Sequence, residues 1–208
     1  KFDFNRGHSF EARDDYGNKY DTTWDKLNFS ACIQQGDYLH RGEQGMFEAA
    51  GFKLFNLMGA EASKTSWVHF RVIDGAAEAG PTQYDGDFFG LYMNIEQLDG
   101  RFLDEHKLPD GNLYKIEGHN AESNNQGPTA VTDRSDFYEF KERRTDGYGY
   151  YQDPNPTEQW WRTNVDLQRY YGYRCVVEGI HHGDIAYGKN WFFYLNPDTD
   201  IWAMYVWD

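Results

Sequence analysis

The chain has 208 residues, of which 39% are hydrophobic and 18% aromatic, so it can bury the core of one compact domain spanning residues 1–208. Acidic residues outnumber basic ones by 34 to 20, and the net charge of −14 disfavours nucleic-acid binding but suits an acidic surface that collects divalent cations. No apolar run approaches the roughly 20 residues that a membrane-spanning helix requires, which argues against a membrane span.

The first half of the chain carries one strongly periodic helix. Residues 1–4 alternate as a strand does, whereas residues 11–30 have the turn-rich composition of a solvated loop and lack the spacing of a calcium loop. Between residues 43 and 58, apolar side chains recur every three or four positions and Gly59 follows. This pattern predicts a helix over residues 43–58 that ends at the glycine.

Two strands and a short helix follow. Residues 67–73 and 88–95 alternate in polarity on either side of a Gly/Pro/Asp-rich connection, which predicts a β-hairpin. Asp99 is a suitable N-cap for a short helix that runs through His106. After a Pro-Asp-Gly turn, residues 112–116 have the composition of another strand.

The next segment is irregular and precedes a long helix. Residues 118–160 are rich in Asn, Gly, Pro and Tyr without a sustained period, so we expect an irregular insertion that serves as a substrate platform or a lid. From Thr163, with Asp166 three positions on as a weak capping box, apolar residues predict a buried helix over residues 163–180.

The residues after this helix have an order that favours phosphoryl transfer. Asp184 is followed by Asn190, and two strands over 191–195 and 201–206 lead to Asp208. Protein kinases place a base aspartate in a loop after a long helix, then a metal-binding asparagine, then a hairpin that delivers a metal-binding aspartate. We therefore predict Asp184 as the catalytic residue, with Asn190 and Asp208 as Mg²⁺ ligands.

The upstream elements also fall in kinase order, which predicts an α+β chain with a diverged protein-kinase-like fold. The polar crossover that starts at Glu96, Gln97 and Leu98 takes the place of the hinge whose backbone binds adenine, and Lys115 is a candidate contact for phosphate. His182 is better explained as a residue that packs and orients the loop than as a general base.

Several runs resemble the CotH (spore coat protein H) family of atypical kinases. They are FKLFNLMGA at 52–60, FGLYMNIEQLDGRFL at 89–103, GNLYK at 111–115, and the segment from Asp184 through Lys189-Asn190 to Trp207-Asp208. The resemblance covers roughly residues 40–117 and 163–208. It implies a secreted or cell-surface phosphotransferase that uses ATP and Mg²⁺ to phosphorylate Ser or Thr of a protein, with Asp184, Asn190 and Asp208 in the roles given above.

Two alternatives to an enzyme remain at this point. The nucleotide-anchoring lysine of the family belongs on an early strand, where only Lys1 stands, so a non-catalytic pseudokinase or a structural module of a surface or filament protein fits as well. A carbohydrate-binding or calcium-stabilised adhesion domain is a third reading, because Trp160 and Trp161 resemble a sugar-stacking platform; paired tryptophans beside a helix are more typical of core packing.

The cysteines and the chain ends complete the expectations. Cys32 and Cys175 are too few for a disulfide scaffold and match no metal-ligand spacing, and we favour two buried thiols over a single bridge. The chain opens on a strand-like pattern and stops at Asp208 within another, so we expect a domain truncated at both ends.

Overall fold

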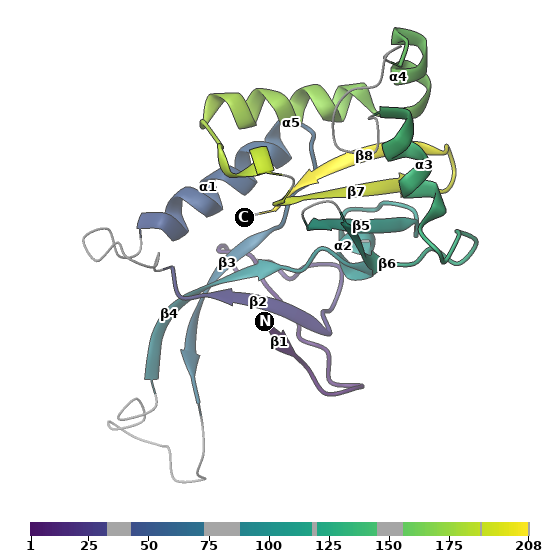
Figure 1. Cartoon of the computed structure of the whole chain (residues 1–208). Helices are drawn as coiled ribbons and strands as arrows, with labels where there is room; N and C mark the ends of the chain where they lie inside the picture. Colours follow the sequence, from purple (N-terminus) through teal and green to yellow (C-terminus); the bar gives the residue numbers. More distant parts are fainter. Residues whose placement is uncertain (33–42, 73–87, 118–119, 145–155, 188, 208) are drawn as a thin grey trace. The chain divides into compact units, whose positions relative to one another are not determined.

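The structure is a computed structural model, and it describes residues 1–32, 43–72, 88–117, 120–144, 156–187 and 189–207. In this part of the chain it contains five α-helices, one short 3-10 helix and eight strands in two antiparallel sheets (Figure 1). The predicted α+β class is confirmed. By their contacts the residues form two compact units, residues 1–50 with 64–97 and residues 51–63 with 98–208.

The first unit is built on a sheet whose strands follow the order β1-β2-β4-β3. These strands are β1 (Phe2–Asp3), β2 (Lys26–Ser30), β3 (Thr65–Arg71) and β4 (Phe88–Glu96). β3 and β4 pair antiparallel, with Thr65 opposite Ile95 and Val68 opposite Tyr92. The predicted hairpin is therefore confirmed.

Residues 11–30 are more ordered than the predicted solvated loop. β2 occupies the last five of them and pairs with β4, so that Leu27 lies opposite Glu96. Leu27 is 1% exposed and packs with Trp24 and Ala12 in a small core of the first unit. The loop prediction was wrong for these five residues. Leu27 and Phe29 alternate as in a strand, but the many turn residues before them dominated the composition of the segment.

Helix α1 (Glu43–Leu57) confirms the predicted helix and belongs to both units. Gly59 has a φ of +76°, the left-handed conformation that commonly ends a helix. In its second half Phe52 and Phe55 are buried, whereas Leu54 and Leu57 are exposed. The ring of Phe55 lies 5.7 Å from that of Tyr173, so packing against a later helix decides which side is buried.

The second unit contains a sheet in the order β6-β5-β7-β8. Its strands are β5 (Asn112–Glu117), β6 (Asn120–Asn125), β7 (Trp191–Asn196) and β8 (Ile201–Val206). β7 and β8 form a hairpin with Trp191 opposite Val206 and Asn196 opposite Ile201. The strands predicted at 112–116, 191–195 and 201–206 are confirmed.

One face of this sheet packs on the helix α2 (Gly100–Glu105) and the residues just before it. The core cluster joins side chains of α2 and its N-terminal flank to alternate residues of three strands: Leu98, Phe102, Leu103, Leu113, Phe192, Tyr194, Ala203 and Tyr205. Asp99 is the N-cap of α2, as predicted, and its carboxylate accepts a hydrogen bond from the backbone N–H of Arg101 at 2.9 Å. The cap and the core together fix the place where the chain re-enters the second unit at residue 98.

The opposite face of the sheet is covered partly by a helix that was not predicted. Residues 118–160 were expected to be irregular, but they contain β6 and the helix α3 (Ser135–Arg144). Phe137 and Phe140 of α3 are buried, and the ring of Phe140 stacks on Trp202 at 4.8 Å. The spacing of these two phenylalanines is helical, but strongly polar neighbours hide the period.

The long helix predicted over 163–180 is two helices, α4 (Glu158–Asn164) and α5 (Leu167–Gly179). Between them Val165 is extended and forms a parallel bridge with Trp202, and the backbone N–H of Asp166 donates to the carbonyl of Trp202 at 2.8 Å. The carboxylate of Asp166 accepts from the N–H of Arg169 at 3.0 Å. Asp166 is thus the N-cap of α5, not the third residue of a helix that starts at Thr163.

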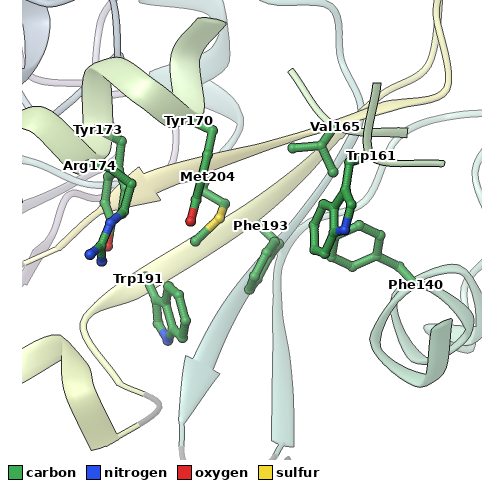
Figure 2. Close-up of a pocket in the computed structure, with 9 residues that line it drawn as sticks. All are labelled: Phe140, Trp161, Val165, Tyr170, Tyr173, Arg174, Trp191, Phe193 and Met204. Carbon is green, nitrogen blue, oxygen red and sulfur yellow. The ribbon is translucent and has the colours of Figure 1, made fainter. Parts of the chain in front are cut away.

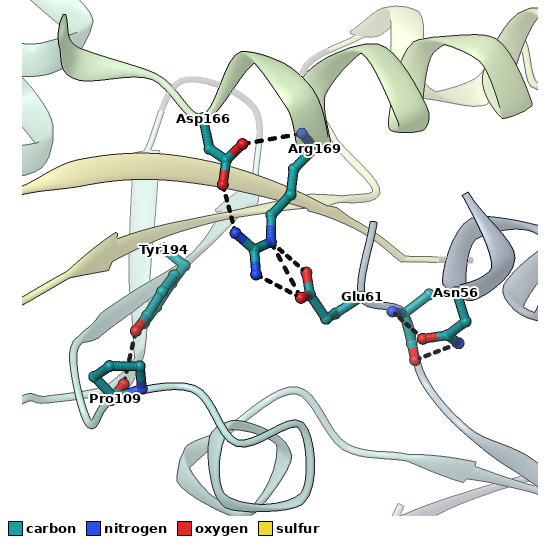
Figure 3. A network of polar contacts seen from close by, with 7 residues as sticks. Asn56, Glu61, Pro109, Asp166, Arg169 and Tyr194 are labelled. Atoms are coloured by element: carbon teal, nitrogen blue, oxygen red, sulfur yellow. Dashed lines mark hydrogen bonds and ion pairs between the residues drawn. The ribbon is translucent and has the colours of Figure 1, made fainter. Parts of the chain in front are cut away.

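An arginine network ties α5 to the segment after α1 (Figure 3). The guanidinium of Arg169 donates to both carboxylate oxygens of Glu61, with its Nε 2.8 Å from Oε2 and Nη2 2.7 Å from Oε1, and it also pairs with Asp166. The side chain of Asn56 bonds twice to the backbone of Ala62, at 2.9 and 3.2 Å. These contacts hold residues 56–62 in the second unit.

Both cysteines are free thiols, as favoured from the sequence, but only Cys32 is buried, because Cys175 lies on an exposed part of α5. Within the described ranges, no helix combines the length and the apolar character needed to cross a bilayer.

Candidate functional site

The predicted catalytic aspartate stands at the start of a short helical turn in the second unit. After α5 ends, His181 adopts a left-handed backbone with a φ of 55°, and the 3-10 helix η1 (Asp184–Tyr187) follows. β7 begins at Trp191, directly after Asn190. The loop therefore places Asp184 and Asn190 on the two sides of one short connection between a helix and a strand.

Asp184 and Asn190 are in direct contact. The side-chain amide nitrogen of Asn190 donates to Oδ2 of Asp184 at 2.8 Å. The ammonium group of Lys189 lies 3.0 Å from the same carboxylate oxygen. The structure thus brings one carboxylate, one carboxamide and one cation together; we call these three residues the 184–190 cluster.

The charge on Asp184 is favoured by this arrangement. The hydrogen bond from Lys189 lowers the pKa of the Asp184 carboxyl below its ordinary value, and the positive charge of Lys189, the hydrogen bond from Asn190 and the charge of His182 act in the same direction. The side chains of Asp184 and Lys189 are 52% and 43% exposed, so this carboxylate is accessible as well as ionised. An accessible carboxylate of this kind can orient a hydroxyl group.

Asn190 is held firmly. It is 9% exposed and has a φ of 65°, a left-handed conformation that asparagine tolerates better than most residues. Its carbonyl accepts a hydrogen bond from the backbone N–H of Trp207 at 2.9 Å. The contact joins the start of β7 to the end of β8, immediately before Asp208, which lies outside the described residues.

A magnesium ion would find oxygen donors of the right kind at this place. The amide nitrogen of Asn190 donates to Asp184, and its amide oxygen is the atom that could serve as a metal ligand. Mg²⁺ in phosphoryl-transfer sites is usually held by one or two side-chain oxygens together with substrate phosphates and water. Among the described residues no group of three or more His, Cys, Asp and Glu side chains gathers, so the fit rests on Asn190 and Asp184 within that part.

The predicted adenine-binding residues lie where the chain leaves the first unit and enters the second. Glu96 is 1% exposed, and its carboxylate accepts from the backbone N–H of Lys64 at 2.9 Å. The side-chain oxygen of Gln97 accepts from Asn28 at 3.0 Å. The carbonyl of Leu98 accepts from the side chain of Asn124 at 3.0 Å, while its own side chain is fully buried. All three residues therefore have structural contacts.

Lys115 lies on β5 opposite Phe192, which is two residues beyond Asn190. Its ammonium group is 2.9 Å from the carboxylate of Glu117, and 30% of its side chain is exposed. The structure pairs this lysine with a neighbouring carboxylate on the same strand. Its contact with phosphate stays a prediction.

The comparison with protein families bears on this loop and on most of the chain. Residues 43–208 match the family described as CotH kinase protein. This chain belongs to the CotH kinase family. No curated protein matches the chain.

Within the CotH match, sequence reasoning missed the role of one residue in the cluster. Lys189 was noted only as part of a motif, yet its ammonium group contacts the carboxylate of Asp184. Its position next to Asn190 could have revealed this contact, because Lys189 and Asn190 together end the loop that begins at Asp184, and both side chains can turn toward that residue. Figure 3 also displays a second set of charged residues, around Arg169, whose contacts are internal to the fold.

Proposed function

We propose that this CotH-family chain transfers the γ-phosphoryl group of ATP, with Mg²⁺, to a serine or threonine hydroxyl of a secreted or cell-surface protein. The observation that carries the proposal is the 184–190 cluster, in which Asn190 and Lys189 both contact one oxygen of Asp184. The family match supports kinase-like chemistry. A diverged protein-kinase-like fold, the metal, the substrate and the location outside the cytoplasm are parts of the proposal.

In the proposed reaction the oxygen of the substrate hydroxyl forms a bond to the γ-phosphorus, the bond from that phosphorus to the β,γ-bridging oxygen breaks, and ADP leaves. Asp184 accepts a hydrogen bond from the attacking hydroxyl and takes its proton as the new bond forms. Because the lowered pKa makes this carboxylate a weak base, its main contribution is to orient the hydroxyl for attack.

The remaining residues of the cluster would stabilise the negative charge of the phosphoryl group during transfer. Lys189, with its ammonium group 3.0 Å from Asp184, supplies a positive charge beside the place where the phosphoryl group would be transferred. Mg²⁺, when bound, would supply positive charge that offsets the negative charge developing during transfer. Asn190 would offer its amide oxygen to the ion, and we assign Asp208 as the second protein ligand.

The nucleotide contacts follow the same scheme. We assign the backbone of Glu96, Gln97 and Leu98 to the adenine ring and Lys115 to a phosphate, because these residues occupy the corresponding places in the order of elements. Each of the three crossover residues is buried and has hydrogen bonds within its own unit, which suits a backbone that presents fixed donors and acceptors.

The test is transfer of radiolabel from ATP to a mixture of surface proteins, or to the protein itself, with and without Mg²⁺. Asp184→Asn should lower kcat by about 10²- to 10⁴-fold with little change in ATP affinity, because its contact is with the hydroxyl. Asp208→Ala should lower the Mg²⁺-dependent rate by at least about 10³-fold. Asp198→Asn, in the exposed turn between β7 and β8, is the matched control and should leave the rate unchanged.

Two outcomes would contradict the proposal. Equal transfer by the wild type and by Asp208→Ala would remove the metal assignment. A folded wild type that neither binds Mg-ATP nor transfers phosphate would favour a pseudokinase or a structural module instead.

A further inference from the structure

An aromatic cavity lies in the second unit, on the side of the sheet that faces α3, α4 and α5 (Figure 2). Its volume is about 190 Å³. Side chains from all three helices and from the β7–β8 hairpin line it, including Phe140, Trp161, Tyr173, Trp191, Phe193 and Met204. Figure 2 shows Tyr173 and Arg174 at one end of this group and Trp161 and Phe140 at the other.

Two polar groups of the lining have no hydrogen-bond partner among the residues that the structure describes. They are the hydroxyl of Tyr173, a residue only 1% exposed, and the indole N–H of Trp191. A buried polar group that forms no hydrogen bond is costly, and buried polar groups in native proteins nearly always have a partner. A ligand in the cavity with an acceptor atom within reach would supply the missing hydrogen bonds.

The polar groups around the cavity determine which chemistry would satisfy them. The indole N–H of Trp191 and the guanidinium of Arg174 only donate, and burial raises the pKa of Tyr173, which keeps its hydroxyl protonated. Arg174 pairs with Glu178 at the rim, and its side chain is 42% exposed. None of the described residues that line the cavity carries a carboxylate or a carboxamide. The site therefore suits a ligand that accepts hydrogen bonds and is otherwise apolar.

The same features argue against a sugar. A sugar presents many hydroxyl groups, each of which needs an acceptor as well as a donor when it is buried. The lining offers aromatic faces with few acceptors, so most of those hydroxyls would lose hydrogen bonds to water without replacement.

The volume limits the size of the ligand. A cavity of about 150 Å³ lined by apolar side chains holds one benzene molecule. The cavity here, at about 190 Å³, has room for one ring and a further group of about three heavy atoms. A carbonyl or carboxylate group attached to the ring fits that space and supplies the acceptor oxygen.

We propose that this cavity is a binding site for a small aromatic carboxylic acid or amide, whose ring packs against Phe193 and Met204 and whose oxygen accepts hydrogen bonds from Tyr173 and Trp191. The proposal is independent of the phosphoryl-transfer hypothesis. Because Trp191 directly follows Asn190, the ligand would contact the residue next to the 184–190 cluster. Its occupancy can be measured without any assay of activity.

The test uses benzamide and benzoate as probes with the full-length protein. Binding is followed by saturation-transfer NMR of the probe and by tryptophan fluorescence, since Trp161 and Trp191 line the cavity. We expect saturable binding of at least one probe at millimolar concentration, with glucose inactive. Tyr173→Phe keeps the ring but removes the hydroxyl, and it should weaken binding about five- to tenfold through the loss of one hydrogen bond.

Two further variants make the result specific. Tyr171→Phe lies on the same helix, at a residue 60% exposed, and should bind the probes as the wild type does. Met204→Trp fills the cavity from β8 and should abolish binding; a folded protein is verified by its circular dichroism. The proposal is overturned if neither probe binds, if glucose competes with them, or if Tyr173→Phe and Tyr171→Phe bind with equal affinity.

Discussion

Gly172 allows α5 to approach the end of α1 closely. A Cβ atom built on Gly172 would lie 2.4 Å from the carbonyl oxygen of Met58 and 3.3 Å from its carbonyl carbon. Carbon and oxygen atoms normally stay about 3.3 Å or more apart, so Gly172→Ala requires the two segments to separate by nearly 1 Å. Forcing extra atoms into a packed region costs about 1–3 kcal/mol, while alanine in a helix recovers about 0.5–1 kcal/mol of backbone entropy. We expect a net loss of about 1–2 kcal/mol in the free energy of unfolding.

Gly179 is the matched control, because the same substitution on the same helix meets empty space. No atom lies within 4 Å of a Cβ built there. Gly179→Ala should therefore leave stability unchanged or raise it by up to about 1 kcal/mol. Urea unfolding followed by tryptophan fluorescence measures both variants, and Gly172→Ala should also lower Tm by roughly 2–8 °C. If the two variants change stability in the same direction and by the same amount, the close approach of Met58 is not the reason why position 172 requires glycine.

Three other changes test contacts described above. Arg169→Ala should lower the free energy of unfolding by about 2–4 kcal/mol, less than the loss of a fully buried ion pair, because the Arg169 side chain is 33% exposed. Arg174→Ala breaks an exposed ion pair on the same helix and should lower it by about 0.5 kcal/mol. Equal losses of the two variants in urea unfolding would contradict this. Lys189→Met should raise the pKa of Asp184 toward its ordinary value. In the variant the Asp184 carboxylate should therefore become protonated at a higher pH than in the wild type. A carboxyl-carbon NMR titration in which the midpoint of Asp184 is unchanged would refute the contact with Lys189. Asp99→Ala should lower the free energy of unfolding by about 1 kcal/mol through loss of the α2 N-cap, as measured by urea unfolding.

The elements predicted correctly are those with an unbroken period and a recognisable end. α1 has Gly59 after it, and the two strands of the β7–β8 hairpin are rich in aromatic and apolar residues on either side of an obvious turn. β6, with the sequence NAESNN, has a single apolar side chain, Ala121, and forms because β5 offers it a partner. Such a strand depends on tertiary pairing and leaves little trace in the sequence.

The break between α4 and α5 had a local signal that was given the wrong meaning. Asp166 can serve either as an early helical residue in a capping box or as an N-cap itself, and both patterns are compatible with the residues around it. The choice is made by Trp202, whose carbonyl accepts the N–H of Asp166 and forces Val165 to be extended. That residue is far away in the sequence, so the local pattern could not decide.

For the candidate site, the sequence was informative about the loop and uninformative about its surroundings. Asp184 and Asn190 were expected to converge, and they share a hydrogen bond. Their roles as catalytic residue and metal ligand remain predictions. The aromatic cavity, in contrast, needs the side chains of three helices and a hairpin; α3 was not predicted, and α4 and α5 were predicted as one helix.

The way in which the two compact units share the chain has a consequence for how the protein folds during synthesis. The backbone passes between the units at residues 50, 63 and 97, so the second unit includes a piece that is made early, residues 51–63. In that piece, Phe55 packs against Tyr173 and Glu61 forms an ion pair with Arg169. A fragment that begins at residue 98 would lack both contacts and should not fold stably by itself. On the ribosome, residues 51–63 cannot pack until α5 has been made, so their apolar side chains stay exposed to chaperones while translation continues.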